Sequence, residues 1–546
     1  MKNFFTIIFS LLLLLMNSCY YTETADLLIH NAKIYTVNEN FDVFEAMAIK
    51  DGKIIDIGPN NELKNRYESK EIIDAQLKSI YPGFIDAHCH FLWYGNTFNE
   101  VDLVGTKSWE EVLDKVEAFS KNNKSEWIVG RGWDQNDWAD KEFPTNQELN
   151  KRFPTTPILL TRIDFHAAIV SKTALQIAGI NSNTTVEGGV IRMEANEPTG
   201  VLIDKAISLV SDKIPKMSKE QMIFALNKAQ EMCFAKGLTS VADAFLENEM
   251  VHVIDSMQKS GELKMNIYGM LAPSEANRKE FLEVGPYITE KLNIHAFKFF
   301  ADGALGSRGA KLLDPYHDDA NNTGLSTLDS LDFLADLRLM YEKGFQVNTH
   351  CIGDGANREV LNAYGEILKG TNDRRWRIEH AQILNPEDFE KFRAYTIIPS
   401  VQPTHATSDM PWAHERLGEE RMKNAYAYRK LLAMNGIIAL GTDFPIEDID
   451  PLKTFYAATV RKDGSGEPEE GFQTENALSR EEALRGMTIW AAMANFEDTL
   501  RGSLEKNKVA DFIILDKDLM KIEESKILQT QVLSTYVDGV VVYKNK

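Results

Sequence analysis

The chain has 546 residues, of which 44% are hydrophobic and 26% are charged. Both shares are ordinary for a soluble globular protein, and the length is sufficient for more than one domain. The 81 acidic residues outnumber the 60 basic ones, which gives a formal net charge of −21. Because nucleic-acid binding needs clustered cations, this balance argues against a nucleic-acid partner.

The first 19 residues, MKNFFTIIFSLLLLLMNSC, have the form of an export signal. Lys2 precedes an apolar run from Phe4 to Met16, and the small residue Ser18 stands before Cys19. A charged start, a short apolar centre and a small residue before the cut are typical of a signal peptide. A cysteine directly after the small residue resembles a bacterial lipoprotein signal. We therefore expect a cell-envelope protein held at the membrane by a lipid on Cys19, with secretion or a retained membrane anchor as the alternatives.

The two ends of the remaining chain are rich in strand-forming residues. Residues 26–80 contain short apolar runs joined by polar turns, with an Asp51-Gly52 hairpin signal between two of them. Residues 501–546 contain further β-rich runs and a second hairpin signal at Asp538-Gly539. Since both ends differ from the middle, we predict one composite β-sandwich domain built from residues 26–80 and 501–546.

The middle of the chain, residues 81–500, alternates between strand-like and helix-like stretches. SKEQMIFALNKAQEMCFAKG, residues 218–237, has helical spacing, a Ser N-cap and a final Gly. Alternation of this kind favours a parallel sheet covered by helices, in the α/β class. More than eight strand-like runs indicate an eight-stranded (β/α)8 barrel of the TIM type, with an insertion at about 100–200.

The stretch PGFIDAHCHF, residues 82–91, places His88 and His90 on either side of Cys89. Three interpretations are open: a metal site, a thiol site, or two neighbouring histidines without a function. In a strand, residues two apart share a face, so both imidazoles can reach one ion while the cysteine faces the helices. This alternation disfavours the thiol site.

Four further strand-like runs carry a charged or metal-binding residue near the carboxyl end, where barrel enzymes keep their chemistry. These residues are Lys298, His350, His380 and Asp443. In RWRIEHA, alternation predicts that Trp376 and Ile378 share the face of His380. A lone histidine in a strand is usually a core residue, so the specific signal is the joint order His-x-His, Lys, His, His, Asp.

This order resembles the amidohydrolase superfamily, and within it the amidohydrolase 3 family, which includes N-substituted formamide deformylase. Further stretches carry the resemblance from about residue 26 to the end: KFFADGALGSRGA, HCIGDGAN, RIEHAQ, GTDFPI, ADFIILD and GRGWDQNDW. The resemblance implies a metal-dependent hydrolase that cleaves a non-peptide carbon–nitrogen bond of a small amide-type substrate through a metal-activated water.

The resemblance also implies a set of six metal ligands: His88, His90, Lys298, His350, His380 and Asp443. The first two histidines and the aspartate would hold one ion, and the two later histidines would hold a second. The lysine would bridge both ions as a CO₂-derived carbamate, and Asp443 would act as general base. Zinc is the expected metal, as one or two ions, with iron, manganese and cobalt as alternatives.

Weaker expectations concern contact with the substrate, and they fall on Arg308, His166, Trp133, Asp134, Gln402 and His405. For Arg308 the alternative is a surface loop. The same metal pair could instead cleave cyclic amides, N-acyl amino acids or esters, or remove an amino group. A non-catalytic envelope binding lipoprotein is the alternative of a different class, and the oligomeric state is open between monomer and homodimer.

Overall fold

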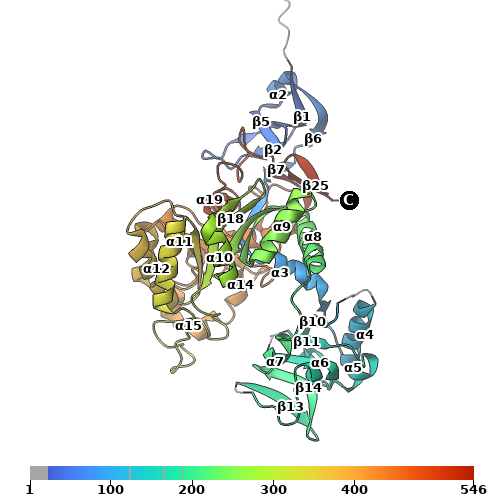
Figure 1. Cartoon of the computed structure of the whole chain (residues 1–546). Helices are drawn as coiled ribbons and strands as arrows, with labels where there is room; N and C mark the ends of the chain where they lie inside the picture. The colour runs from blue at the N-terminus through green and yellow to red at the C-terminus, as the bar shows by residue number, and fades with distance from the viewer. Residues whose placement is uncertain (1–21, 122–124, 164–165, 187, 546) are drawn as a thin grey trace, which may run out of the picture. The chain divides into compact units, whose positions relative to one another are not determined.

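The structure is a computed structural model that describes residues 22–121, 125–163, 166–186 and 188–545. It divides into two compact units: unit 2 is Leu92–Ala229, and unit 1 is the rest of the described chain (Figure 1). The predicted lipidation residue, Cys19, lies outside the described residues. Within the described ranges, every helix is too short or too polar to cross a membrane.

Unit 1 contains an eight-stranded parallel barrel, as the α/β alternation predicts. Each strand pairs with the next in chain order, in the series β8 (Phe84–Cys89), β15 (Leu238–Leu246), β16 (Asn266–Leu271), β18 (Leu292–Phe300), β19 (Gln346–Cys351), β20 (Arg377–His380), β21 (Ile398–Val401) and β22 (Ala439–Leu440). The short strand β17 (Tyr287–Ile288) pairs antiparallel with the start of β18, at Asn293 and Ile294. The last strand returns to the first, because Asp443 N donates to His88 O and His90 N donates to Phe444 O, both at 2.8 Å.

Helices follow the barrel strands in sequence. They are α9 (Asn248–Lys259), α10 (Glu275–Val284), α11 (Ser330–Lys343), α12 (Asp354–Leu368), α13 (Phe389–Ala394), α14 (Pro403–Asp409), α15 (Ala413–Met422), α16 (Tyr428–Asn435), α17 (Pro451–Val460), α18 (Arg480–Gly486) and α19 (Ile489–Ala494). The predicted helix at 218–237 is α8 (Lys219–Ala235), which begins in unit 2 and ends in unit 1. Ser218 Oγ accepts from Gln221 N at 3.3 Å, as its position before the first turn predicts.

A composite β domain in unit 1 joins the two ends of the chain. One sheet holds strands from both ends: β3 (Val43–Phe44), β2 (Lys33–Tyr35), β7 (Ser79–Pro82), β23 (Phe512–Leu515), β24 (Val532–Val537) and β25 (Val540–Lys544). The other holds β5 (Lys53–Gly58), β4 (Ala46–Lys50), β1 (Glu23–His30) and β6 (Tyr67–Asp74), with α2 (Asn60–Arg66) beside them. Their facing apolar side chains form one core, which includes Ile49, Ile80 and Phe512.

The two Asp-Gly signals form the hairpins that the sequence predicts. Asp51 and Gly52 have φ of 50° and 74° between β4 and β5, and Asp538 and Gly539 have φ of 50° and 71° between β24 and β25. Positive φ at both central residues defines the turn type whose twist matches paired strands. The two turns meet, since a Cβ at Gly52 would lie 3.2 Å from Asp538 Cβ.

Unit 2 is built on a six-stranded sheet of its own, and the predicted insertion at about 100–200 lies inside it. The strand order is β13 (Gly189–Glu194), β14 (Glu197–Asp204), β12 (Ala167–Val170), β11 (Ile158–Arg162), β10 (Ile128–Trp133) and β9 (Val101–Asp102). Its helices are α3 (Phe91–Asn96), α4 (Trp109–Ser120), α5 (Gln147–Arg152), α6 (Lys172–Ile177) and α7 (Ser208–Ser211). Two apolar clusters lie in this unit, one around Trp133 and the other around Val170.

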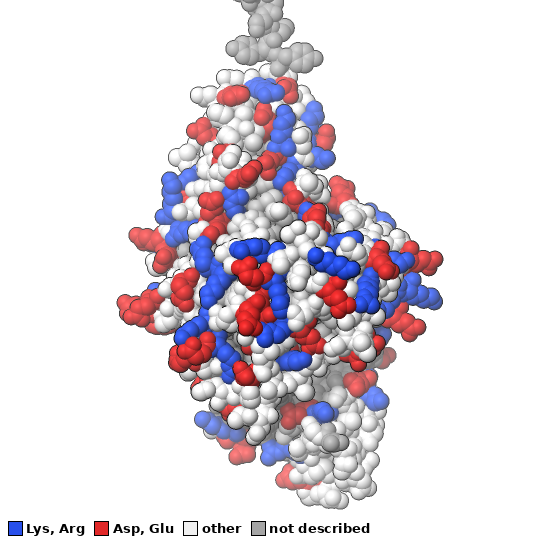
Figure 2. All heavy atoms as spheres, turned by 90° about the vertical axis from the view of Figure 1, so that its left-hand side faces the viewer, with Lys and Arg blue, Asp and Glu red and all other residues white. Residues whose placement is uncertain are grey.

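Acidic and basic side chains are intermixed on the molecular face drawn in Figure 2. Ion pairs at the surface include Lys259 with Asp255 at 2.7 Å and Arg338 with Glu366 at 2.6 Å. Exposed pairs of this kind stabilise a fold only slightly, so the positions of the site residues rest on the buried contacts described below.

Candidate metal centre

All six ligands implied by the resemblance come together at the carboxyl ends of the barrel strands. β8 carries His88, with His90 directly after it; β18, β19 and β20 carry Lys298, His350 and His380; and Asp443 follows β22. The His380 ring centroid lies 5.0 Å from that of His88 and 4.4 Å from that of His350. A single barrel mouth therefore collects side chains that lie hundreds of residues apart in the sequence.

The first compact group of donors is His88, His90 and Asp443, whose ligand atoms lie within 4.8 Å of one another. Asp443 Oδ1 lies 3.5 Å from His88 Nε2 and 3.2 Å from His90 Nε2. Burial opposes ionisation of Asp443, but its contacts with both imidazoles hold the pKa of its carboxyl well below the usual range. Two imidazoles and one carboxylate so close together are a typical zinc ligand set.

The remaining ring nitrogens of these histidines are occupied in a way that orients the rings. His88 Nδ1 lies 2.6 Å from Glu379 Oε2, and His90 Nδ1 lies 3.2 Å from Ala244 O. A carboxylate or carbonyl on Nδ1 favours the tautomer whose Nε2 lone pair is available to a metal. The structure thus directs Nε2 of each histidine to the same place.

Cys89 faces away from this group, as strand alternation predicts. Its Sγ donates to Ala242 O at 3.6 Å, and its side chain is fully buried. Burial raises the pKa of the thiol well above its ordinary value, so the group stays protonated and unreactive. The thiol interpretation of the HCH motif is therefore wrong.

At His380, by contrast, the prediction from strand alternation is wrong. Trp376 packs its ring 4.8 Å from that of Tyr364 on α12, so this face of β20 points to the helices. His380 nevertheless reaches the site because its φ is 73°, which turns the end of the strand. Its Nδ1 lies 2.7 Å from Gln402 Oε1, which leaves Nε2 for a ligand.

Glu379 is a site residue that the sequence reasoning missed. It is fully buried between His88, Lys298 and Arg377. Burial disfavours its charge, but these three neighbours hold the pKa of the carboxyl at about 2. The available signal was the dipeptide Glu-His at a strand end. In a regular strand these two side chains would lie on opposite faces, but the turn at His380 places both at the site.

Lys298 and His350 each have a buried polar atom, Nζ and Nε2 respectively, without a hydrogen-bond partner among the described residues. Burial lowers the pKa of Lys298 to about 8, and burial together with the Lys298 charge lowers that of His350 to about 3. Unpaired buried polar atoms are costly, and an ion with its ligands would satisfy them, so the donor set fits a metal centre.

Comparison with known proteins agrees with this geometry. The model of the Amidohydrolase family matches residues 71–543. The chain belongs to the amidohydrolase family.

Several relatives match this amidohydrolase along nearly its whole length. The amidohydrolase YtcJ of Bacillus subtilis is 34% identical over 94% of this chain and 99% of its own, and LONG AFTER FAR-RED 3 of Arabidopsis thaliana is 33% identical over 95% and 92%. N-substituted formamide deformylase of Arthrobacter pascens is 26% identical over 96% and 99%.

A solved structure supports the fold and the metal dependence. The uncharacterized metal-dependent hydrolase from Pyrococcus horikoshii is 28% identical, with a TM-score of 0.78 over 91% of this chain and 99% of that one. The chain is accordingly a hydrolase that depends on a metal and acts on carbon–nitrogen bonds.

Two of the residues predicted to contact the substrate of this amidohydrolase have other contacts in unit 1. Arg308 forms a two-point ion pair with Asp318, at 3.1 and 2.8 Å, in a half-exposed loop. The position of Arg308 therefore agrees with the alternative prediction, a residue of a surface loop. Gln402 is buried and holds His380 through Oε1, so its observed contact is with a metal ligand.

His405, which was also predicted to contact the substrate, lies among the metal ligands. Its ring stacks on that of His380 at 5.7 Å and 15°, and its Nε2 lies 3.7 Å from Asp443 Oδ2. The ligand atoms of these three residues form a second compact group, again within 4.8 Å of one another.

The other three predicted substrate residues belong to unit 2. Trp133 is fully buried in the core of that unit and donates from Nε1 to Leu160 O at 2.8 Å, which is a packing role and not the predicted pocket-lining one. Asp134 accepts from Arg162 at 2.6 Å. His166 is exposed, and its Nδ1 lies 2.8 Å from Asp204 Oδ1.

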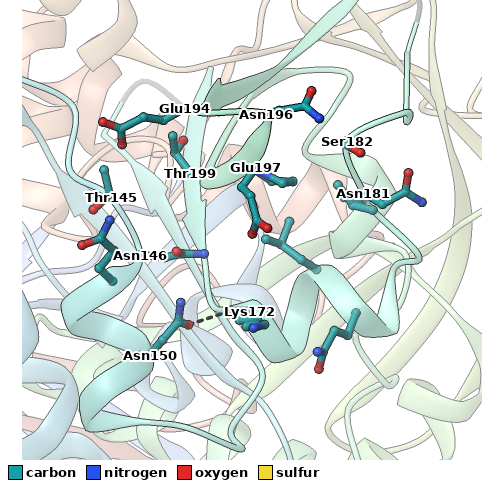
Figure 3. A pocket seen from close by; sticks show the side chains of 15 residues that line it. Thr145, Asn146, Asn150, Lys172, Asn181, Ser182, Glu194, Asn196, Glu197 and Thr199 are labelled. Carbon is teal, nitrogen blue, oxygen red and sulfur yellow. Dashed lines mark hydrogen bonds between the residues drawn. The ribbon is translucent and has the colours of Figure 1, made fainter.

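A cavity of the amidohydrolase lies in unit 2 and has a volume of about 450 Å³ (Figure 3). Polar side chains from α5, α6 and the β13–β14 hairpin line it, among them Asn146, Lys172 and Glu197. Across its floor, Lys172 N donates to Asn150 Oδ1 at 2.7 Å. None of the predicted site residues in the described ranges lines this cavity.

We predict that Glu379→Gln weakens metal binding about 10- to 100-fold, because His88 loses the charged acceptor that orients its ring. The measurement is a competition titration of the purified chain against a metal chelator. Glu387→Gln, an exposed glutamate in the short 3-10 helix Pro386–Asp388 after β20, is the matched control and should bind metal as the wild type does. Equal affinities of all three proteins would contradict the orienting role.

Proposed function

We propose that the site uses zinc to hydrolyse a non-peptide amide bond of a small substrate. The observation that carries this proposal is the pair of Nε2 atoms, of His88 and His90, both within 3.5 Å of one Asp443 oxygen. Imidazole and carboxylate donors favour zinc, and the relative named as a formamide deformylase supports an amide bond as the target.

In the proposed reaction, the residues of the site have separate roles. A bound divalent ion lowers the pKa of water to about 7 and polarises a carbonyl group. His88 and His90 hold the ion, with Glu379 and Ala244 O keeping their rings in place. Asp443 accepts the proton of the attacking water on its carboxylate and donates it to the leaving nitrogen, so the amide yields a carboxylic acid and an amine.

Lys298 takes part as a carbamate in this proposal. An ammonium group cannot ligate a cation, whereas addition of CO₂ to the neutral Nζ forms an N–C bond, releases one proton and leaves a carboxylate. The support is the full burial of Lys298 and the lack of a partner for its Nζ among the described residues. A carboxylate at this place would occupy a position beside His350 and His88, whose pKa values already respond to the Lys298 charge.

An aromatic rim, formed by Phe245 and Phe300, indicates what kind of amide fits. The rings lie 5.2 Å apart at the ends of β15 and β18, and they are 43% and 36% exposed. The Phe300 ring is also 5.4 Å from the His350 ring. Phe245 has a φ of 76°, a conformation that bulky residues adopt rarely and that collects at functional sites. We therefore propose a substrate with an apolar or aromatic group next to the amide.

Cyclic amides, N-acyl amino acids and esters are the alternatives within the same chemistry, and a non-catalytic envelope binding protein is the alternative outside it. A panel of N-formyl, N-acyl-amino-acid and cyclic-imide compounds separates the first three. The exposed aromatic rim favours an open-chain amide with an apolar substituent, because such a group can lie on the rings while the amide reaches the ligands.

The proposal also places the protein in the cell envelope, with a lipid on Cys19. It rests on the sequence of residues 1–19, where the apolar run and Ser18 precede the cysteine.

Asp443→Asn should reduce kcat about 10²- to 10⁴-fold, because an amide cannot accept the proton of the attacking water. The measurement is turnover of the best substrate from the panel, with the metal content of each sample determined in parallel. Asp448→Asn, a half-exposed aspartate in the same loop that pairs with Lys453, should retain the wild-type rate. Wild-type turnover by the Asp443 variant would exclude this residue as the base.

Phe300→Ala should lower kcat/KM for amides with an aromatic substituent roughly 10-fold, since one ring contact is lost, and should hardly affect amides with a methyl substituent. Steady-state kinetics on matched pairs of substrates measure this difference. Leu77→Ala, an exposed apolar residue of the composite β domain, is the control. A uniform loss on all substrates would show that Phe300 supports the site and does not select the substrate.

Cys19→Ser should move the protein from the membrane fraction to the soluble fraction of an expressing bacterium and abolish its labelling by radioactive palmitate. Cys233→Ala, which removes a buried thiol of α8, should keep the label. Labelling of the Cys19 variant at the wild-type level would contradict the proposed anchor.

A further inference from the structure

Arg377 is a fully buried arginine of β20 that has no role in the proposed reaction. It lies two residues before Glu379, so a regular strand directs both side chains to the same face. Its guanidinium carbon lies 5.1 Å from the centre of the Tyr268 ring, which comes from β16. Because an arginine stays charged inside a protein, this side chain places a fixed positive charge in the barrel.

This charge lies next to the carboxylate that orients a metal ligand. Arg377 Nη1 is 3.9 Å from Glu379 Oε1, and Glu379 Oε2 is 2.6 Å from His88 Nδ1. Glu379 Oε1 is buried and accepts no hydrogen bond from the described residues. Attraction to a nearby cation, rather than a hydrogen bond, therefore holds this half of the carboxylate.

Three neutral acceptors fix the guanidinium in this place. Nη1 donates to Ala87 O at 3.2 Å, and Nη2 donates to Ala494 O and Asn495 Oδ1, both at 2.5 Å. These contacts hold the group without balancing its charge. In the described part of the chain, Glu379 is the one carboxylate within 4.0 Å of Arg377. The guanidinium is thus rigidly placed, and its charge acts on a single anion.

The proposed reaction makes this cation more important. Glu379 is fully buried, and its charged neighbours are His88, Lys298 and Arg377. A histidine that ligates an ion is neutral, and a lysine that has become a carbamate is negative. Of the three neighbours, Arg377 alone then remains positive. Since a buried carboxylate without a compensating cation is costly, the arginine supports the hydrogen bond between Glu379 and His88.

We infer that Arg377 is a positioning residue of the metal centre, whose fixed charge holds the Glu379 carboxylate against the His88 ring. Its side chain is fully buried, and its contacts are with residues that flank or orient a ligand, so it acts on the centre indirectly. This inference rests on the proposed function, because it takes His88 as a ligand and Lys298 as a carbamate of the same centre.

The test is a double-mutant cycle on the zinc affinity of the full-length chain, measured by competition with a chelator. Arg377→Gln alone should weaken zinc binding roughly 10-fold, because Glu379 loses its cation. In the Glu379→Gln background, where the charge pair is already absent, the same change should cost less than about 3-fold. Equal losses in both backgrounds would overturn the inference, since Arg377 would then act independently of Glu379.

Arg377→Lys separates the charge from the structural contacts. It keeps a cation but lacks the planar fork that reaches β8 and α19 together, so Tm should fall while zinc affinity stays within about 3-fold of the wild type. Zinc binding as weak as that of Arg377→Gln would also overturn the inference. Arg358→Gln, an arginine of α12 that pairs with Glu387 and Asp388, is the matched control and should bind zinc as the wild type does.

Circular dichroism identifies a variant that fails to fold, and Arg377→Met replaces Arg377→Gln in that case. A wild-type chain that binds no zinc would overturn the inference together with the proposed function. The expected pattern of zinc affinities without hydrolysis of any amide in the panel would contradict the proposed function alone. Amide hydrolysis by the wild type, combined with equal zinc affinities of the wild type and Arg377→Gln, would contradict this inference alone.

Discussion

The site depends on the backbone pairing that joins the last barrel strand to the first. Asp443 N donates to His88 O and His90 N donates to Phe444 O, so the peptide groups next to the ligands hold the two strand ends together. The approach is close, because a Cβ at Gly441 would lie only 2.5 Å from His88 N. Only glycine allows this contact, and the contact brings Asp443 to the two histidines of β8.

A buried carboxylate beneath the ligands stabilises the same junction. Asp86 accepts hydrogen bonds from Thr442 N, Thr442 Oγ1 and His88 N, which ties β8 to the loop after β22. Burial raises the pKa of Asp86 to about 6, even though these hydrogen bonds favour its charge. A second layer of polar contacts thus supports the candidate metal ligands. Its members Asp86, His88 and Thr442 are all buried.

The orientation of the ligands comes from three different acceptors. A carboxylate (Glu379), a backbone carbonyl (Ala244) and a side-chain amide (Gln402) each occupy one Nδ1. Such contacts select the tautomer and fix the ring, and their loss typically weakens metal binding about 10- to 100-fold. They come from β20, β15 and the end of β21, which means that the centre needs most of the barrel and not only the strands that bear its ligands.

Sequence periodicity predicted part of this site correctly. It placed His88 and His90 on one side of β8 and Cys89 on the other, because a regular strand alternates its side chains. The same rule failed at β20, where the positive φ of His380 turns the chain at its end. A period of two carries no information about such a turn, so the pattern did not indicate that Glu379 lies at the site.

By itself, the sequence predicted the class of the fold and the joining of the two chain ends in β structure, and its resemblance to the family implied six candidate ligands. These follow from local patterns and from the spacing of residue types. Only the tertiary structure decided which residues lie within reach of one another: His405 beside Asp443, Arg308 bound to Asp318, and Trp133 buried in the core of unit 2. The physical reason is that these contacts depend on strand adjacency and on single backbone angles, and neither is encoded in a short stretch of sequence.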